Sequence, residues 1–317
     1  MDSIGVVVLT HGRHEQYAEL VRSLLEDGVP ATAIAVVQNP THRGDPPVAP
    51  PHEDVTVIRP EENRGYTGGM NLGIRHHLAR DVELVLMLTH EVRFRRGALA
   101  SLIEGSRGAA SFGVLGPALW WRGEDRPFSY GGRRGRRGGL QHIVDEPKAA
   151  ASNGVAACDW IDGAVMLIRA EVLRAQGPFD ERFFIYLEDS ELCLRAERGG
   201  WRVGVVLDAV AEQAPGGASR PGAYAYLTSR NGLEYARLAA GTAGWLGRLA
   251  RHLQESPPLV RSWVRNRADL DERARCRVRL TGLWLGTLDF LRRRWGPPPA
   301  LLTGLGDLQG TSSPPPA

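Results

Sequence analysis

IGVVVLT, at residues 4–10, is an uninterrupted apolar run close to the start of the chain. Continuous apolar runs of this length are typical of strands that are buried on both faces, as in a parallel sheet. The segment that follows, residues 14–26, carries apolar side chains at helical spacing: Tyr17, Leu20, Val21, Leu24 and Leu25. This spacing predicts an amphipathic helix directly after the strand.

The same alternation continues along the first two thirds of the chain. Further strands are expected at residues 34–38, 55–58, 84–88, 164–168 and 203–207, with further helices at residues 68–80 and 188–198. Strands that alternate with helices indicate a mostly parallel, Rossmann-like α/β sheet flanked by helices. Residues 122–139 interrupt the pattern with paired glycines and arginines, as in a basic flap over a phosphate-bearing ligand or in a solvated hairpin.

The pattern changes after residue 222. Residues 224–253 and 273–294 are long helical stretches with no strand between them, and the sequence from residue 296 is rich in Gly, Pro, Ser and Thr. We therefore expect an α/β domain at residues 1–222, a helical region at 223–295 and a disordered tail at 296–317. The apolar surface of the last helix, flanked by arginines, suits packing on the α/β domain, a homodimer contact or docking on an anionic membrane.

Composition excludes several classes of protein. The 317 residues are 43% hydrophobic and 24% charged, which supports a packed core. A net charge of +3 without a basic block argues against a nucleic-acid partner. Three well-separated cysteines form neither a disulfide framework nor a CxxC metal site, as expected in the reducing cytoplasm. With no signal peptide or transmembrane segment expected, association with the inner face of a membrane would be peripheral.

Four segments carry most of the residues suited to chemistry. They read VVLTHGR at residues 7–13, NRGYTGGMNLG at 63–73, LMLTHEV at 86–92, and DWIDGA followed by FDERFFIYLEDSELCLR within 159–195. In this order they resemble the inverting family-2 glycosyltransferases, particularly the rhamnosyltransferase-like branch, over residues 4–235. The resemblance implies a GT-A fold, with a nucleotide-sugar half at about residues 1–95 and an acceptor half at about residues 96–222.

The resemblance also implies a donor site at the carboxyl ends of the strands, where open α/β sheets bind ligands. Arg13 offers charge-assisted hydrogen bonds to diphosphate oxygens. The amides of Gln38 and Asn39 stand where the family usually carries an aspartate that reads the nucleobase. The expected donor-binding residues are Thr10, His11, Arg13, Gln38, Asn39, Gly65, Gly69, Asn71, Thr89 and His90.

Thr89-His90-Glu91 stands where the family places aspartates that hold a divalent cation against the diphosphate. Glu91 alone keeps a carboxylate and is the expected metal ligand, while Gln213 stands where the family often carries a histidine. One carboxylate together with the diphosphate can still hold Mg²⁺ or Mn²⁺. The neighbouring imidazole of His90 favours Mn²⁺.

Glu188 and Asp189 are the expected catalytic pair. An inverting transfer needs a base for the acceptor hydroxyl, and Asp189 lies at the start of an expected helix. The helix N-terminus favours the ionised form of Asp189, whereas the neighbouring carboxylates of Glu188 and Glu191 favour the neutral form. The expected acceptor-binding residues are Trp160, Asp162 and Gly163.

The sequence therefore predicts transfer of a hexosyl or deoxyhexosyl group from a nucleoside-diphosphate sugar to a hydroxyl of a glycan, a lipid-linked glycan or a small natural product. The altered acidic motif leaves a second hypothesis, a sugar-nucleotide-binding protein without turnover. A Rossmann dehydrogenase is disfavoured, because no glycine fingerprint follows the first strand.

Overall fold

The computed structural model describes residues 3–12, 14–42, 45–147, 154–214, 221–265 and 269–303. The chain divides into two compact units. The first, here called the α/β unit, comprises Met1–Arg133, Gln141–Asp180 and Glu188–Ala214. The second, called the helical unit, comprises Arg134–Leu140, Glu181–Leu187 and Pro215–Ala317.

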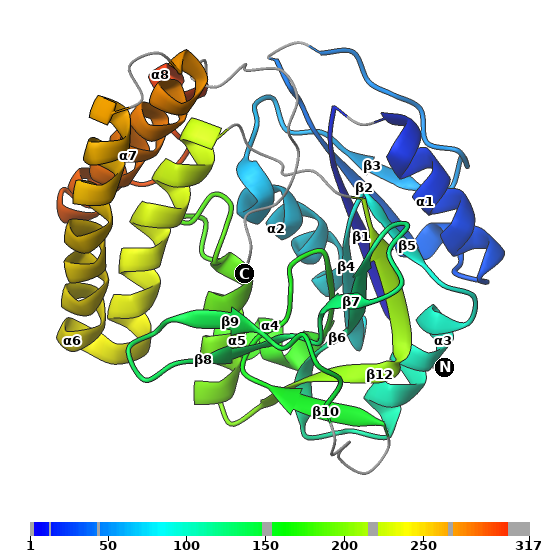
Figure 1. The fold of residues 1–317 in the computed structure, drawn as a ribbon. Coiled ribbons are helices and arrows are strands. Elements are labelled where there is room, and N and C mark those ends of the chain that lie inside the picture. The colour runs from blue at the N-terminus through cyan, green and yellow to red at the C-terminus, as the bar shows by residue number, and fades with distance from the viewer. Residues whose placement is uncertain are drawn as a thin grey trace. The chain divides into compact units, whose positions relative to one another are not determined.

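A ten-stranded sheet forms the centre of the α/β unit (Figure 1). Its strands are β1 (Ile4–His11), β2 (Ile34–Asn39), β3 (Thr56–Ile58), β4 (Leu84–Thr89), β5 (Val92–Phe94), β6 (Phe112–Trp121), β7 (Pro127–Ser129), β10 (Val155–Cys158), β11 (Val165–Arg169) and β12 (Arg202–Gln213). They lie in the order β10-β12-β6-β11-β4-β1-β2-β3, with β5 paired to β12 and β7 to β6.

The strands β3, β2, β1 and β4 are parallel, so their carboxyl ends share one edge of the sheet. Beyond them the sheet is mixed, because β11 runs antiparallel to both β4 and β6. The predicted Rossmann-like arrangement is thus found in the N-terminal half of the sheet.

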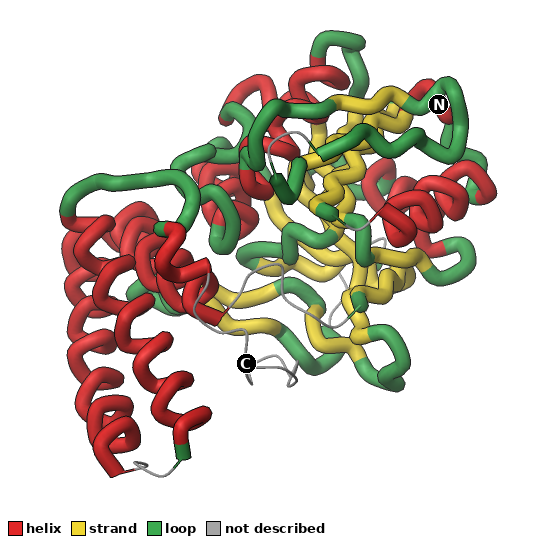
Figure 2. Tube along the Cα trace, turned by 90° about the horizontal axis from the view of Figure 1, so that it is seen from above, coloured by secondary structure: helices red, strands yellow, loops and turns green. Residues whose placement is uncertain are grey.

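Helices cover both faces of this sheet. Figure 2 shows them in red on either side of the yellow strands. They are α1 (His14–Glu26), α2 (Gly65–Leu78), α3 (Ala98–Arg107), α4 (Ala170–Gln176) and α5 (Glu188–Arg198). Val6 and Val8 of β1 share a buried core with Leu20 of α1. On the other face, a Cβ on Gly73 of α2 would collide with Val7. The run at residues 4–10 is therefore apolar throughout, because both of its faces are covered.

Helix α2 begins at Gly65, three residues before the expected start. Gly65 has a φ of +68°, in the left-handed region that favours glycine. Its N–H donates to Oδ1 of Asn63 over 2.8 Å. This turn places the aromatic ring of Tyr66 in the first turn of α2, where it is 7% exposed.

The helical unit contains α6 (Pro221–Arg265), α7 (Leu270–Leu291) and α8 (Ala300–Thr303). It also includes the tip of the hairpin formed by β8 (Gly132–Arg134) and β9 (Leu140–His142). The basic stretch at residues 122–139 thus contains β7 and the first half of this hairpin. Helix α6 is kinked at Ala240 and Gly241.

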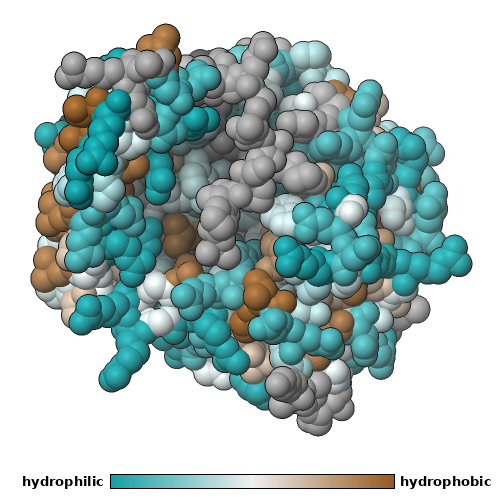
Figure 3. All heavy atoms as spheres, in the orientation of Figure 1, coloured by the Kyte–Doolittle hydropathy of each residue, from teal (hydrophilic) through white to brown (hydrophobic). Residues whose placement is uncertain are grey.

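Four leucines of α6 and α7 are exposed: Leu246, Leu253, Leu288 and Leu291. Figure 3 shows apolar residues among hydrophilic ones over these helices. No helix within the described ranges is long and apolar enough to cross a membrane. Packing, dimerisation and membrane docking all stay predictions for this surface.

The structure corrects the expected disorder of residues 296–317 in part. Ala300–Thr303 form α8, and Leu302 is fully buried with Tyr226 and Leu227 of α6. The rest of the expected tail, residues 304–317, lies outside the described residues.

We predict that Leu302→Ala lowers the free energy of unfolding by about 2–5 kcal/mol, as for other buried leucines. The matched control is Leu301→Ala, because Leu301 is 65% exposed. That change should stay within about 0.5 kcal/mol of the unsubstituted protein in urea denaturation. Equal effects of the two substitutions would show that α8 does not pack on α6.

Candidate active site

The carboxyl ends of β1, β2 and β4 bring together most of the expected donor-binding residues. Thr10 lies beside Gln38 and His11 beside Asn39 in the register of β1 and β2, and Thr89 ends β4. The hydroxyl oxygens of Thr10 and Thr89 are buried and have no hydrogen-bond partner among the described residues. Because a buried polar group without a partner costs free energy, a polar ligand at this edge would satisfy them.

The amides of Gln38 and Asn39 are engaged within the protein. Gln38 Nε2 donates to the Val48 carbonyl over 2.6 Å, and the Val48 N–H donates to Gln38 Oε1 over 3.2 Å. Asn39 donates to the Gly65 carbonyl over 2.6 Å and accepts from the Arg64 N–H over 3.3 Å. Their expected contact with a nucleobase stays a prediction, since the side chains would have to exchange these bonds.

Asn71 and Gly69 of α2 have packing roles that the sequence did not reveal. Asn71 is buried, accepts from the Phe179 N–H over 3.0 Å and donates to the Phe179 carbonyl over 2.9 Å. It thereby ties α2 to the chain that leads toward Glu188. Gly69 lies against Leu9 of β1, where a Cβ would not fit. Donor contacts of both residues stay predictions, and Arg13 lies outside the described residues.

Glu91 lies between His90 and Gln213. His90 Nε2 is 3.3 Å from Glu91 Oε2, and Gln213 donates to Glu91 Oε1 over 3.3 Å. Within the part of the chain that the structure describes, no group of three or more His, Cys, Asp or Glu side chains is arranged to hold a metal. A cation here would have one carboxylate and one imidazole as protein ligands and would need substrate oxygens to complete its coordination.

Asp189 lies in the first turn of α5, where two backbone N–H groups hold its carboxylate. Oδ2 accepts from Gly163 over 2.9 Å, and Oδ1 accepts from Ser190 over 2.6 Å. These bonds favour the ionised form, but burial and the charge of Asp162 outweigh them and raise the pKa of Asp189 to about 6. At neutral pH the carboxylate is therefore mostly ionised and is a stronger base than an ordinary aspartate.

The charges around Asp189 differ in part from those expected. The carboxylate of Glu191 forms an ion pair with Arg195 at 2.8 Å, and the charge of Asp162, which was not expected, acts on Asp189. The expected repulsion between Glu188 and Asp189 is present. Glu188 is 4% exposed, and its Oε2 has no hydrogen-bond partner among the described residues. Burial, followed by the charge of Asp189, raises the pKa of Glu188 well above its ordinary value.

Tyr66 belongs to this site, although the sequence analysis did not select it. Its hydroxyl donates to the Gly163 carbonyl over 2.6 Å. Burial, and then the charges of Glu188, Asp189 and Glu91, raise the pKa of Tyr66 well above its ordinary value. The expected catalytic pair and the expected metal ligand therefore lie around one phenol. The aromatic position of the glycine-rich motif was the signal that could have identified it.

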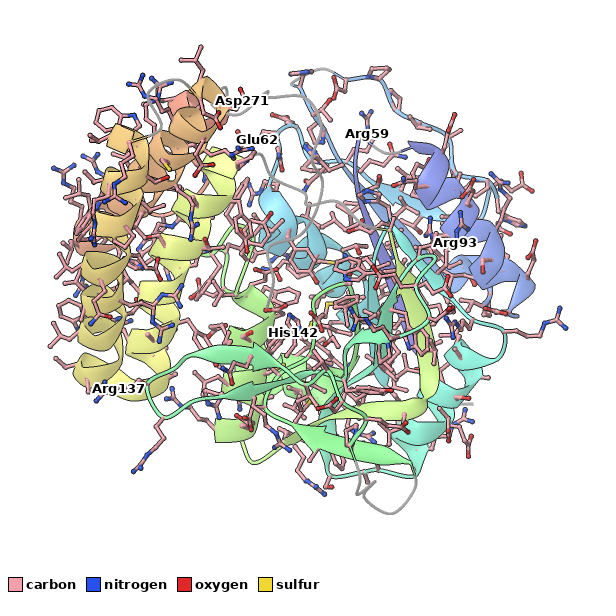
Figure 4. All side chains as sticks on the ribbon, in the orientation of Figure 1. Arg59, Glu62, Arg93, Arg137, His142 and Asp271 are labelled. Atoms are coloured by element: carbon pink, nitrogen blue, oxygen red, sulfur yellow. The ribbon has the colours of Figure 1, made fainter. Side chains whose placement is uncertain are left out.

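The expected acceptor-binding residues Trp160 and Asp162 lie in a cluster with Ser129 and His142. Ser129 donates to Asp162 Oδ2 over 2.6 Å, and His142 Nδ1 lies 3.8 Å from Asp162 Oδ1. Figure 4 labels His142 on β9, where its ring lies edge-on to Trp160 at 4.7 Å between centroids. No motif marks Ser129 or His142, since they lie on different strands, β7 and β9, and only the tertiary fold brings them to Asp162. Trp160 is 5% exposed, and its buried Nε1 has no hydrogen-bond partner among the described residues, so its expected contact with the acceptor stays a prediction.

The chain is related in sequence to glycosyltransferases, although no protein-family model matches it. It is 28% identical over 169 residues to the low-salt glycan biosynthesis hexosyltransferase Agl10 of Haloferax volcanii, covering 51% of this chain and 53% of that protein. It is 22% identical over 303 residues to the N-acetylglucosaminyl-diphospho-decaprenol L-rhamnosyltransferase of Mycobacterium tuberculosis, covering 88% and 98%. These relatives confirm the predicted resemblance.

Solved glycosyltransferase structures share the fold. A mannosyltransferase from Pyrobaculum calidifontis, in complex with GDP-Man and Mn²⁺, matches with a TM-score of 0.53 at 14% identity, over 92% of this chain and 88% of that chain. GalNAc-T7 with UDP, GalNAc and Mn²⁺ matches with a TM-score of 0.54 at 13% identity, over 75% and 50%. The chain thus spans about half the length of GalNAc-T7 and of the hexosyltransferase. The predicted GT-A fold is confirmed.

Proposed function

We propose that this protein transfers a hexosyl or deoxyhexosyl group from a nucleoside-diphosphate sugar to an acceptor hydroxyl, with inversion at the anomeric carbon. The observation that carries the proposal is the carboxylate of Asp189, which two backbone N–H groups hold and whose pKa is raised to about 6. The glycosyltransferases among the sequence relatives support the reaction class.

Asp189 acts as the general base. It takes the proton of the acceptor hydroxyl while that oxygen forms a bond to the anomeric carbon. The bond from the anomeric carbon to the diphosphate oxygen breaks, and its electron pair leaves with the nucleoside diphosphate. Attack from the face opposite the leaving group inverts the anomeric centre. The N–H groups of Gly163 and Ser190 keep the carboxylate in one orientation for this transfer.

The donor binds at the carboxyl edge of β1, β2 and β4. The unpartnered hydroxyls of Thr10 and Thr89 supply hydrogen bonds to it there. Glu91 and His90 would hold a divalent cation, which neutralises charge that develops on the leaving diphosphate. Because Gln213 offers Glu91 an amide in place of a further anionic or imidazole ligand, a cation held here would depend mainly on the oxygens of the substrate.

The acceptor binds beside Asp162 and His142, on the side of Asp189 where Gly163 lies. The M. tuberculosis relative is named for a saccharide acceptor carried on a lipid diphosphate. On that ground we propose a saccharide hydroxyl as the acceptor. We place the reaction in the cytoplasm, because the three free cysteines suit a reducing compartment.

We predict that Asp189→Asn lowers kcat by about 10²–10⁴-fold, because the amide keeps the shape of the carboxylate but cannot take the proton. Donor affinity should not change. Turnover is measured as release of nucleoside diphosphate from a panel of nucleotide sugars with saccharide acceptors.

The control is Asp208→Asn, which removes an exposed carboxylate of β12 and should leave kcat unchanged. Unchanged turnover in Asp189→Asn would refute the role of this residue as the base. A wild-type protein that binds nucleotide sugars and turns over none of them would support the sugar-nucleotide-binding hypothesis instead.

We predict that chelation lowers turnover and that added Mn²⁺ restores it. Glu91→Ala should raise the Mn²⁺ concentration for half-maximal rate by at least about 10–100-fold, since it removes a direct carboxylate ligand and loss of even an outer-shell partner costs that much. Gln213→His should lower that concentration, since it places an imidazole beside Glu91. If turnover is indifferent to chelator and to both substitutions, the leaving diphosphate is stabilised without a cation.

A further inference from the structure

The segment Glu181–Leu187, which directly precedes the catalytic pair, has an unusual backbone. Phe184, Tyr186 and Leu187 have φ values of 64°, 74° and 69°. The left-handed region costs a residue with a side chain about 1–2 kcal/mol, and such residues persist only where their surroundings hold them. Three of them within four positions therefore require a specific restraint.

Asn231 of α6 provides part of that restraint. It is fully buried, and its Nδ2 lies 2.8 Å from the carbonyl oxygen of Phe183 and 2.9 Å from those of Ile185 and Tyr186. Its Oδ1 accepts from Nε of Arg230 over 3.0 Å, so the nitrogen end of the amide faces the segment. The side-chain amide of Asn231 thus lies within hydrogen-bond distance of three backbone carbonyls of residues 181–187.

Arg230 adds two further contacts to the segment. Its guanidinium is fully buried and donates to the carbonyl oxygens of Arg182 and Phe183 over 3.3 Å. It also donates to the hydroxyl of Tyr226, which in turn donates to Asp289 over 2.8 Å. Burial lowers the pKa of Arg230, while Tyr226 and Asp289 act in the opposite direction. A buried cation with this many partners has little freedom to move.

Apolar packing supports the same turn from the same helix. Phe184, Ile185 and Tyr186 pack against Tyr226 and Leu227. The aromatic run before the catalytic pair is therefore partly buried within the helical unit, and its carbonyls face the polar clamp of Arg230 and Asn231.

We propose that Asn231 and Arg230 are positioning residues for glycosyl transfer. They hold Phe184, Tyr186 and Leu187 in the left-handed conformation and so fix where α5 begins, because one peptide bond joins Leu187 to Glu188. The direction of the Asp189 side chain depends on that start. The inference rests on the proposed role of Asp189, and it gives the C-terminal helices a part in catalysis that packing alone does not imply.

The test compares Asn231→Ala with Ser229→Ala. Ser229 is also buried on α6, but its hydroxyl donates to the Leu283 carbonyl of α7 over 2.8 Å and, within the described residues, makes no hydrogen bond to residues 181–187. We expect Asn231→Ala to lower kcat by about 10–100-fold, since misplacement by about 1 Å costs of this order. Donor affinity should stay within about twofold, and Ser229→Ala should leave kcat unchanged at a comparable loss of thermal stability.

A second-site change separates positioning from general destabilisation. Glycine adopts positive φ without steric cost, so Leu187→Gly should restore part of the lost kcat in the Asn231→Ala protein. Amide hydrogen exchange at residues 183–187 should be faster in Asn231→Ala and unchanged in Ser229→Ala. If Asn231→Ala does not fold, Asn231→Ser, which keeps one donor, is measured with the same expected directions.

Two results would overturn the inference in distinguishable ways. Wild-type protein that turns over no nucleotide sugar would remove the proposed function, and the positioning role with it. Wild-type turnover together with an unchanged kcat in the Asn231 variant, or an equal loss in Ser229→Ala, would remove the positioning role alone.

Discussion

The hydrogen bonds from Gly163 and Ser190 to Asp189 are the constraint on which the candidate site depends. They hold a carboxylate near those of Asp162 and Glu188, where burial and like charge favour protonation. The balance raises the pKa of Asp189 to about 6, so the group is mostly ionised at neutral pH and still basic. Tyr66 holds the same residue, Gly163, from its other end by donating to the Gly163 carbonyl.

The two ends of the candidate site differ in how closely they follow the resemblance seen in the sequence. At the catalytic end, Glu188 and Asp189 keep the expected carboxylates on α5. At the donor end, Glu91 is the single carboxylate and Gln213 lies beside it. Glu91 and Gln213, the two departures from the family pattern, lie far apart in the sequence but are in contact in the structure. Both therefore affect the same cation site. The lower negative charge at this end weakens the affinity of the protein alone for a cation. More of the coordination of the cation is then left to the diphosphate.

Local pattern predicted the elements whose causes are local. The apolar run at β1 and the span of α5, which the Gly199–Gly200 pair closes, match the expectation. The predicted start of α2 was wrong, because Gly65 adopts a left-handed conformation and begins the helix three residues earlier. Ser129, His142 and Asn71 owe their roles to long-range contacts with Asp162 and Phe179, which no spacing reveals. The tail differed from the expected disorder at residues 300–303, because Leu302 packs in a buried position on α6.

The pH dependence of kcat/KM tests the central claim most directly, because it reports the ionisation of the essential base in the free enzyme. A carboxylate base is active only when it is ionised. Activity is therefore lost as the pH falls through the raised pKa of the base. The account predicts that kcat/KM is constant above neutral pH and falls tenfold per pH unit below a pKa of about 6. A profile that stays flat down to about pH 4.5, below which an ordinary aspartate would titrate, would contradict it.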